Sequence, residues 1–211
     1  MQWIERITKN IFPLSFNKQD IRAALDEWEY RGEMNDQIEP NSICELCDHS
    51  YIRFQFEIVN KNNSNNLLIG SECITKFGVK VFDEMGNLLD GVHAKDKVAK
   101  DRRKLVVEAK IKNMFNSILA LCKIQEEKLN FENFINDYQK RGAFTPKQLS
   151  TLFWRLENNK IPHVKTDFKL YITKPSYKQQ LLGMKDWELK RLWPALSLPQ
   201  RKLLKNKFNI K

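Results

Sequence analysis

The sequence predicts an α+β protein that is predominantly helical. A small zinc-stabilised β-hairpin module is followed by a long helix and a helical C-terminal region. Three observations lead to this prediction: alternating apolar residues follow a C-x2-C pair, a long stretch then has helical spacing, and the last third contains helix-capping and proline signals. We place a boundary near Gly91, which gives regions 1–91 and 92–211, and Gly142 is a candidate for a second break.

The stretch before the cysteine pair predicts one helix and one loop. Ile21, Leu25 and Trp28 recur at helical spacing, so a helix is expected over residues 18–30. Residues 32–40 are polar and are expected to form a loop.

A β-hairpin and a short helix are expected after the cysteine pair. Apolar and polar residues alternate over residues 52–58, which is typical of a half-buried strand. An Asn-rich turn and a short apolar run at residues 66–70 complete a hairpin. Residues 71–78 then predict a helix with Cys73 in its first turn and Gly78 at its end. A second small hairpin is expected around Gly86.

The remainder of the chain predicts helices. From residue 94 to about 129 one face is apolar, carried by Val107, Ile111, Met114, Ile118 and Leu121. A helix over residues 131–141 stops at Gly142, and the next begins at Thr145 with a T-x-x-Q capping box and Pro146 in the first turn. Two or three shorter helices are expected beyond Pro162.

The cysteine content and the charge distribution limit the classes of protein to which this chain can belong. Four cysteines without a signal segment favour reduced thiols in a soluble, cytoplasmic protein. No apolar run approaches the roughly 20 residues that span a bilayer, so no membrane role is expected. Residues 140–211 contain 17 Lys and Arg but four Asp and Glu, whereas residues 1–139 contain 19 and 22. This asymmetry indicates an anionic partner near the C-terminal third, most often nucleic acid.

Three cysteines have the spacing of a metal site. Cys44 and Cys47 can direct two sulfurs at one ion, and Cys73 returns at the start of a helix. We therefore expect Zn²⁺, with His49 as the nearest fourth ligand and His93 or a water molecule as the alternatives. Cys122 lies on an apolar helical face and is expected to be a buried small hydrophobe.

The order of knuckle, hairpin and ligand-bearing helix over residues 43–78 resembles a treble-clef zinc finger. Such a family usually supplies two ligands from the helix, whereas this helix supplies Cys73 alone, with Ser71 and Glu72 beside it. The Asn-, Lys- and Ile-rich composition is similar to that of small phage or mobile-element proteins. A structural zinc is favoured over a catalytic one because the zinc-deaminase signature is absent.

Basic and aromatic residues alternate in the C-terminal third, a combination that suits phosphates and unpaired bases. The expected nucleic-acid-binding residues are Lys147, Arg155, Lys160, Lys165, Lys169, Lys174, Lys178, Lys190, Arg191, Arg201, Lys202 and Lys205. Arg102, Arg103 and Lys104 are further candidates for phosphate contact. The alternative for the whole region is a solvated basic surface.

Together these features predict a non-enzymatic, zinc-containing nucleic-acid-binding accessory protein in replication, recombination or regulation. The first alternative is a protein-binding inhibitor or adaptor, such as a counter-defence protein. The second is a treble-clef zinc-dependent nuclease that uses His49 and Asn60, although the paired histidines of such enzymes are missing. Phosphate-binding loops and nucleophile elbows are absent from the sequence, which gives no support to nucleotide hydrolysis or ester hydrolysis.

Overall fold

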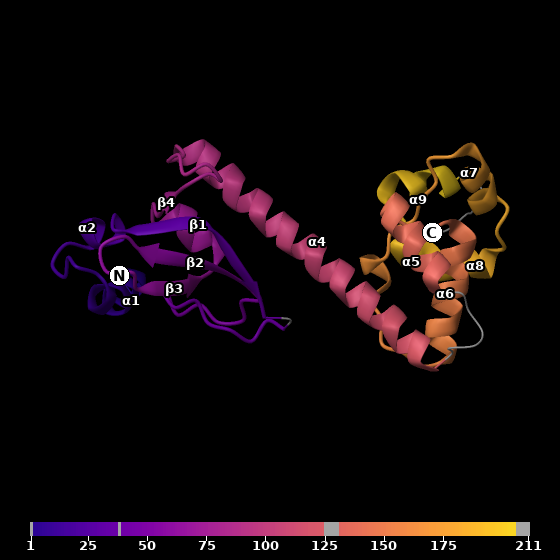
Figure 1. Cartoon of the computed structure of the whole chain (residues 1–211), viewed down its shortest axis with the longest axis horizontal. Helices are drawn as coiled ribbons and strands as arrows, with labels where there is room; N and C mark the ends of the chain where they lie inside the picture. The colour runs from indigo at the N-terminus through magenta and orange to yellow at the C-terminus, as the bar shows by residue number, and fades with distance from the viewer. Residues whose placement is uncertain (1, 38, 125–130, 206–211) are drawn as a thin grey trace. The chain divides into compact units, whose positions relative to one another are not determined.

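The structure is a computed structural model that describes residues 2–37, 39–124 and 131–205 (Figure 1). The chain divides into two compact units, Met1–Ala109 (unit 1) and Lys110–Lys211 (unit 2), each with its own hydrophobic core. The predicted α+β, predominantly helical class is confirmed. Gly91, where we placed the boundary, is the first residue of helix α4 (Gly91–Ile124), and the division between the units falls later within this helix.

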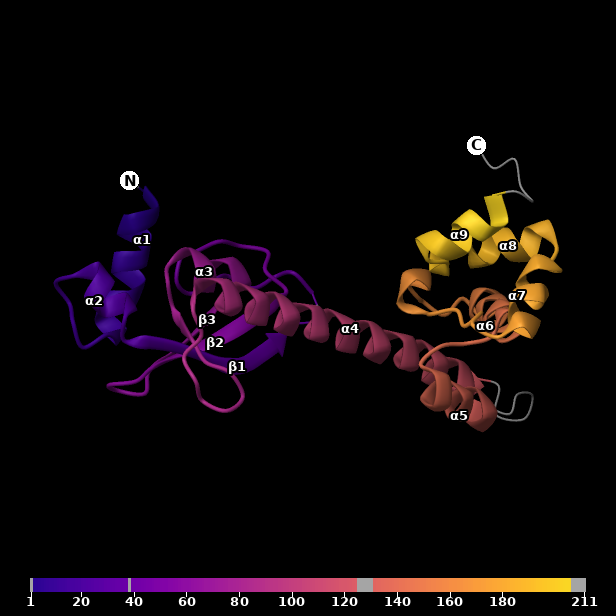
Figure 2. The same ribbon diagram turned by 90° about the horizontal axis from the view of Figure 1, so that it is seen from above.

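Unit 1 is built on a four-stranded sheet with strand order β3-β2-β1-β4. Neighbouring strands are antiparallel, except that β4 runs parallel to β1. Figure 2 shows α1 and α2 beside one end of the sheet. The elements are α1 (Gln2–Ile11), the 3-10 turn η1 (Phe12–Leu14), α2 (Ile21–Leu25), β1 (Trp28–Asp36), β2 (Phe54–Asn60), β3 (Asn66–Ile69), α3 (Ser71–Lys76) and β4 (Lys80–Val81).

The helix predicted over residues 18–30 is wrong in its second half. Helix α2 ends at Leu25, and β1 begins at Trp28 and extends through most of the predicted loop. Trp28 and Tyr30 are both fully buried, and Tyr30 pairs with Ile58 of β2. Aromatic residues fit a strand as well as a helix, and here pairing with β2 decides the outcome.

The predicted hairpin and short helix are present. Phe56 and Ile58 of β2 are buried and pair with Ile69 and Leu67 of β3. Helix α3 follows after Gly70 and contains Cys73. Around Gly86 the chain forms a tight turn closed by a single antiparallel bridge between Phe82 and Leu88, less than the predicted second hairpin.

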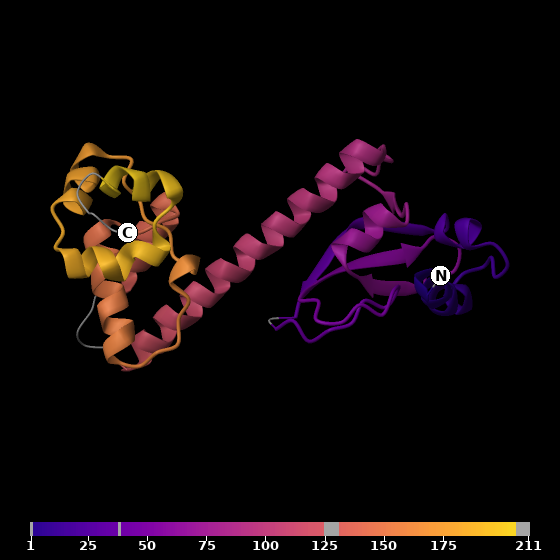
Figure 3. The ribbon, with the colours of Figure 1, turned by 180° about the vertical axis from the view of Figure 1, so that it is seen from behind.

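Unit 2 is helical, as expected, and Figure 3 shows its helices from behind. After the end of α4 it contains α5 (Phe131–Arg141), α6 (Pro146–Asn158), η2 (Lys165–Asp167), α7 (Pro175–Leu182), α8 (Asp186–Leu192), η3 (Trp193–Ala195) and α9 (Leu198–Lys205). Phe144, Phe153 and Phe168 are fully buried in its core. The predicted last turn of the long helix, residues 125–129, lies outside the described residues. Within those described ranges, none of the helices has both the length and the apolar character needed to cross a bilayer.

Candidate metal centre and the cleft beside it

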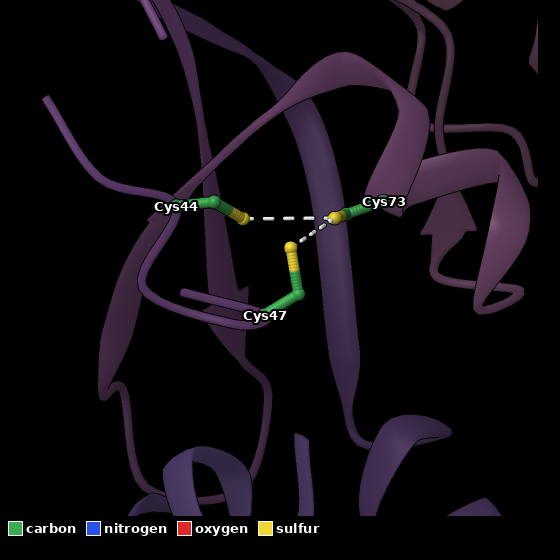
Figure 4. A group of neighbouring side chains, drawn as sticks. All are labelled: Cys44, Cys47 and Cys73. Carbon is green, nitrogen blue, oxygen red and sulfur yellow. Dashed lines mark hydrogen bonds between the residues drawn. The ribbon is translucent and has the colours of Figure 1, made fainter. Parts of the chain in front are cut away.

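Three cysteine side chains converge between the knuckle and helix α3 (Figure 4). The sulfur of Cys73 lies 3.6 Å from that of Cys44 and 3.4 Å from that of Cys47, and all three sulfurs lie within 4.8 Å of one another. Cys44 and Cys73 are buried, and Cys47 is partly exposed. The sequence prediction that these three residues form one group is therefore met by the geometry.

Backbone hydrogen bonds hold the knuckle in a tight loop. The amide of Cys44 donates to the carbonyl of His49 at 2.8 Å, and the amide of Asp48 donates to the carbonyl of Cys44 at 2.9 Å. Asp48 and Tyr51 both have a left-handed backbone, with φ of 59° and 64°. Such a conformation is unusual for a bulky residue, and here it turns the chain back toward β2.

The hairpin carries the third cysteine to this loop. The amide of Glu45 donates to the carbonyl of Leu68 in β3 at 3.0 Å, which fixes the knuckle against the strand that leads into α3. The amide of Gly70 points at the Cys44 sulfur at 3.4 Å. Three residues after Gly70, α3 places Cys73 against the cysteine pair.

The donor set suits a metal ion that prefers thiolates. Four sulfurs around a tetrahedral zinc at 2.3 Å would lie about 3.8 Å apart. The measured separations of 3.6 and 3.4 Å are close to that value. Three cysteines in this arrangement can hold a metal ion, and an ion bound there would retain one position for a further ligand.

One of the three cysteines carries the negative charge more readily than the others. The hydrogen bond from the Cys73 thiol lowers the pKa of Cys44 to about 5, against the opposing effect of burial, and the Gly70 amide adds to the lowering. The same hydrogen bond, together with burial, raises the pKa of Cys73. Burial also raises the pKa of Cys47. Cys44 is thus the cysteine of the cluster that ionises most readily, whereas Cys47 and Cys73 favour the thiol form.

The histidines considered as fourth ligands do not complete this group. His49 is exposed and lines the adjoining cleft, but among the described residues the group with converging ligand atoms contains the three cysteines alone. His93 is exposed in the first turn of α4, where its ring faces Asp90 at 2.8 Å. Cys122 is partly buried against the core of unit 2, in line with its predicted apolar role.

A cleft of about 550 Å³ opens beside the cysteines. Its basic residues come from four separate parts of unit 1, and its aromatic residues surround them. Glu72 is the single carboxylate in the described lining. The cations are Arg6, Arg53, Lys76 and Arg102, and the aromatic side chains are Trp3, Tyr51, Phe54 and Phe77.

Two of these cations are engaged by neighbours in different ways. Arg53 forms a two-point ion pair with Asp36, at 2.7 and 3.0 Å, and its guanidinium lies over the Phe54 ring. The Lys76 ammonium lies 5.5 Å from the centroids of the Trp3 and Phe77 rings, which stack on each other. In the described part of the chain, Lys76 has no carboxylate partner.

Sequence reasoning missed most of this cleft. Arg102 was a candidate for phosphate contact because it belongs to a basic run, but Arg6 and Lys76 stand alone in the sequence. One signal was available for Lys76, which follows Cys73 by three residues and thus lies one helical turn away. No comparable signal exists for Arg6.

The basic residues expected to bind nucleic acid are distributed over unit 2. Among those described, two partly buried arginines pack on tryptophans: Arg191 lies over Trp187 and Arg201 over Trp193. Lys165 and Arg191 both pair with Glu157, at 2.6 and 2.9 Å. The exposed lysines are Lys147, Lys160, Lys169, Lys174, Lys178, Lys190 and Lys202.

Arg155 and Lys205, which were also expected to bind nucleic acid, differ from these exposed lysines. Arg155 is partly buried on α6. Lys205 is the last residue of α9, and its side chain lies outside the described structure.

Asn60, proposed with His49 for a nuclease, is fully buried at the end of β2. Its amide donates to Glu27 at 2.7 Å, so its role here is to support the fold.

Fold and site together define an α+β protein with a three-cysteine cluster beside a basic, aromatic cleft. No protein family, curated protein or solved structure matches this chain.

Proposed function

We propose that this protein is a non-enzymatic nucleic-acid-binding accessory protein in which a structural Zn²⁺ holds the hairpin module of unit 1 together. The observation that carries the proposal is the charge of unit 2. It contains 21 Lys and Arg against eight Asp and Glu, whereas unit 1 contains 15 and 18. Cations on such a surface neutralise phosphates and release counterions.

Two of the carboxylates described in unit 2, Asp137 and Glu157, form ion pairs with basic residues of the same unit. Asp137 pairs with Arg141 at 2.5 Å and accepts a hydrogen bond from Gln148 at 2.6 Å. Glu157 joins α6 to Lys165 and Arg191. These pairings leave the exposed lysines as the main source of surface potential.

One basic surface is well enough defined to test. The amide of Lys147, at the start of α6, donates to the side chain of Gln180 in α7 at 3.0 Å. Lys174 and Lys178 lie at the start of α7 and one turn later, so all three lysines surround the α6–α7 junction. All three are exposed, and none pairs with a carboxylate in the described chain.

For the zinc, the support is the donor set and its spacing, together with the order of knuckle, hairpin and helix that resembles a treble clef. Thiolate-rich sites are mostly structural. Elemental analysis of the purified protein should give about one zinc per chain, because Cys44, Cys47 and Cys73 form a single cluster in the described residues. A protein free of zinc and other metals would remove this part of the proposal.

Salt-titrated binding to single- and double-stranded DNA and RNA tests the nucleic-acid function. We expect binding at low salt that weakens steeply as salt is added. The slope of log K against log salt is negative, and replacing Lys147, Lys174 and Lys178 together by Gln should make it shallower by about 2 for a single strand. The matched control replaces Lys18, Lys61 and Lys100, which are exposed lysines of unit 1.

Three results would contradict the proposal. Absence of binding at low salt for every nucleic acid would favour the inhibitor or adaptor hypothesis. Equal slopes for the two triple variants would show that the α6–α7 junction does not bind phosphate. Cleavage of the nucleic acid that is lost in His49→Ala would favour the nuclease hypothesis.

A further inference from the structure

We propose that the cleft beside the cysteine cluster binds a short segment of single-stranded nucleic acid, with phosphates at Arg6 and Arg102 and an unpaired base on Tyr51. This inference rests on the proposed function and adds a site in unit 1 to the basic surface of unit 2.

The concentration of positive charge in the cleft runs against the charge of its surroundings. Unit 1 as a whole has an excess of three acidic residues. The cleft nevertheless gathers Arg6 from α1, Lys76 from α3 and Arg102 from α4. Within the described chain none of the three forms an ion pair with a carboxylate. Like charges collected in a concave surface repel one another, and an anion bound among them removes that cost.

The fold brings these cations together from distant points of the chain. Arg6 and Arg102 are both exposed, and each lies on a helix that packs on the core of unit 1 through Ile7 and Val98. Because the arginines contribute little to that core, their position in the cleft has no evident structural purpose.

Tyr51 offers the surface on which a base can stack. Its side chain is 80% exposed, although its backbone φ of 64° is unfavourable for a residue of this size. The neighbouring Ile52 is fixed by a pair of backbone hydrogen bonds to Ser42, at 3.0 and 3.3 Å. A large ring is thus held at the edge of the cleft on a restrained backbone. Base–aromatic stacking of this type tolerates any sequence.

Trp3 plays a different part. Its ring is stacked on Phe77 with centroids 5.5 Å apart, and the Lys76 ammonium lies over both rings. These three residues form a wall that fixes the position of the Lys76 charge. The size of the cleft, about 550 Å³, falls within the range of small-ligand sites, roughly 300–1,000 Å³.

A single strand fits these features better than a duplex does. Bases in a duplex are stacked on one another, whereas unpaired bases can turn out and stack on aromatic side chains. The combination of phosphate-binding cations and an exposed ring is the arrangement that single strands require.

The cations have one competing explanation. A Zn²⁺ ion held by three thiolates carries a formal charge of minus one, so nearby arginines could serve to neutralise the metal centre. That explanation predicts that removing the arginines weakens metal binding, whereas our proposal predicts that the metal is retained. The experiment therefore measures nucleic-acid binding and zinc content together.

The test compares two double variants of the full chain. Arg6→Gln with Arg102→Gln removes two charges from the cleft. Lys9→Gln with Lys100→Gln removes two exposed charges from the same helices but outside the cleft lining. Binding of fluorescein-labelled oligothymidylate and of a duplex of equal length is measured by anisotropy, together with zinc content and thermal unfolding.

We expect the cleft variant to bind oligothymidylate about tenfold more weakly. The negative slope of log K against log salt should become shallower by about 1.4. The control variant should change binding much less, and both should keep their zinc. Tyr51→Leu should weaken single-strand binding about fivefold or more while leaving duplex binding unchanged, because a leucine cannot stack on a base.

The outcomes separate this inference from the proposed function. If the wild-type protein binds no nucleic acid, the proposed function fails and the inference fails with it. If the wild type binds and the two double variants bind equally, only the inference is overturned. Loss of zinc from the cleft variant, with unchanged affinity in its zinc-loaded fraction, would assign the arginines to the metal centre and likewise overturn it.

Discussion

Glu27 is a single carboxylate on which several parts of unit 1 depend. It is almost fully buried and accepts hydrogen bonds from the amides of Phe16 and Asn17, at 2.7 and 2.6 Å, and from Asn60 at 2.7 Å. It thereby joins the segment after η1 to the end of β2. Burial alone would raise the pKa of Glu27, but these donors outweigh it and hold the pKa below the ordinary value of 4.5.

Replacing this carboxylate should destabilise unit 1 in a pH-dependent way. Glu27→Gln turns an amide toward the backbone amides of Phe16 and Asn17, which donate to the carboxylate, so we expect a loss of about 2 kcal/mol in the free energy of unfolding at pH 7. Because the folded-state pKa is lowered, the contribution of Glu27 is complete above pH 4.5 and fades as the pH falls through the folded-state value.

Urea unfolding of the wild type and the variant at pH 7 and at pH 3 measures this difference. Glu33→Gln is the matched control, since Glu33 is an exposed carboxylate of β1. A deficit in Glu27→Gln that stays constant across this pH range would show that the lost stability does not come from the ionised carboxylate.

At the scale of elements, the sequence could predict structure where the signals are local. The hairpin, helix α3 and the start of α6 depend on alternation, turn composition and capping residues within a few positions of one another. Strand β1 could not be predicted in this way. Its first residue, Trp28, also fits a helical pattern with Ile21 and Leu25, and the choice is made by β2, more than twenty residues further along the chain.

The N-terminus of helix α6 provides a test of one local signal. The Gln148 amide donates to the Thr145 hydroxyl at 3.4 Å, and the Thr145 amide donates to the Gln148 side chain at 3.1 Å. Thr145→Ala removes the first of these bonds and should lower the stability of unit 2 by about 1 kcal/mol.

Thr151 on the same helix is exposed and makes no cap, so Thr151→Ala serves as the control. It should leave stability unchanged or raise it slightly, because alanine has the higher helix propensity. Chemical denaturation followed by circular dichroism measures both variants. Equal effects of the two substitutions would argue against a capping contribution.

On the scale of the whole molecule, the two cores separate the consequences of losing the metal. The core of unit 1 includes Cys44 and Cys73, whereas the core of unit 2 begins at Met114. Cys73→Ser removes the sulfur that lies nearest to both others, so we expect loss of zinc and destabilisation of unit 1 alone.

Calorimetry should then show one transition at lower temperature and one that is unchanged. Cys122→Ser is the control, since Cys122 lies in unit 2 away from the cluster, and it should retain the full zinc content. Zinc retained in Cys73→Ser, or an equal shift of both transitions, would contradict a structural metal confined to unit 1.

The candidate site shows the same division between local and long-range information. Cys44, Cys47 and Cys73 could be grouped from the sequence because a tight turn and one hairpin connect them. The cleft could not be predicted, since Arg6, Lys76 and Arg102 come from three helices that only the folded chain brings together. The sequence shows the excess of basic residues in unit 2, but it does not show which of the lysines remain exposed.

The odd number of sulfurs in the cluster makes it chemically fragile without its ion. A disulfide between any two of them, such as Cys47 and Cys73 at 3.4 Å, consumes two ligands and leaves one thiol that cannot retain a metal by itself. Cys47 is the partly exposed cysteine of the three, so its sulfur is the one that an oxidant reaches most easily. A metal ion bound by the three cysteines would therefore shield the thiols from air, and metal-free protein kept without reductant would lose the capacity to take up an ion.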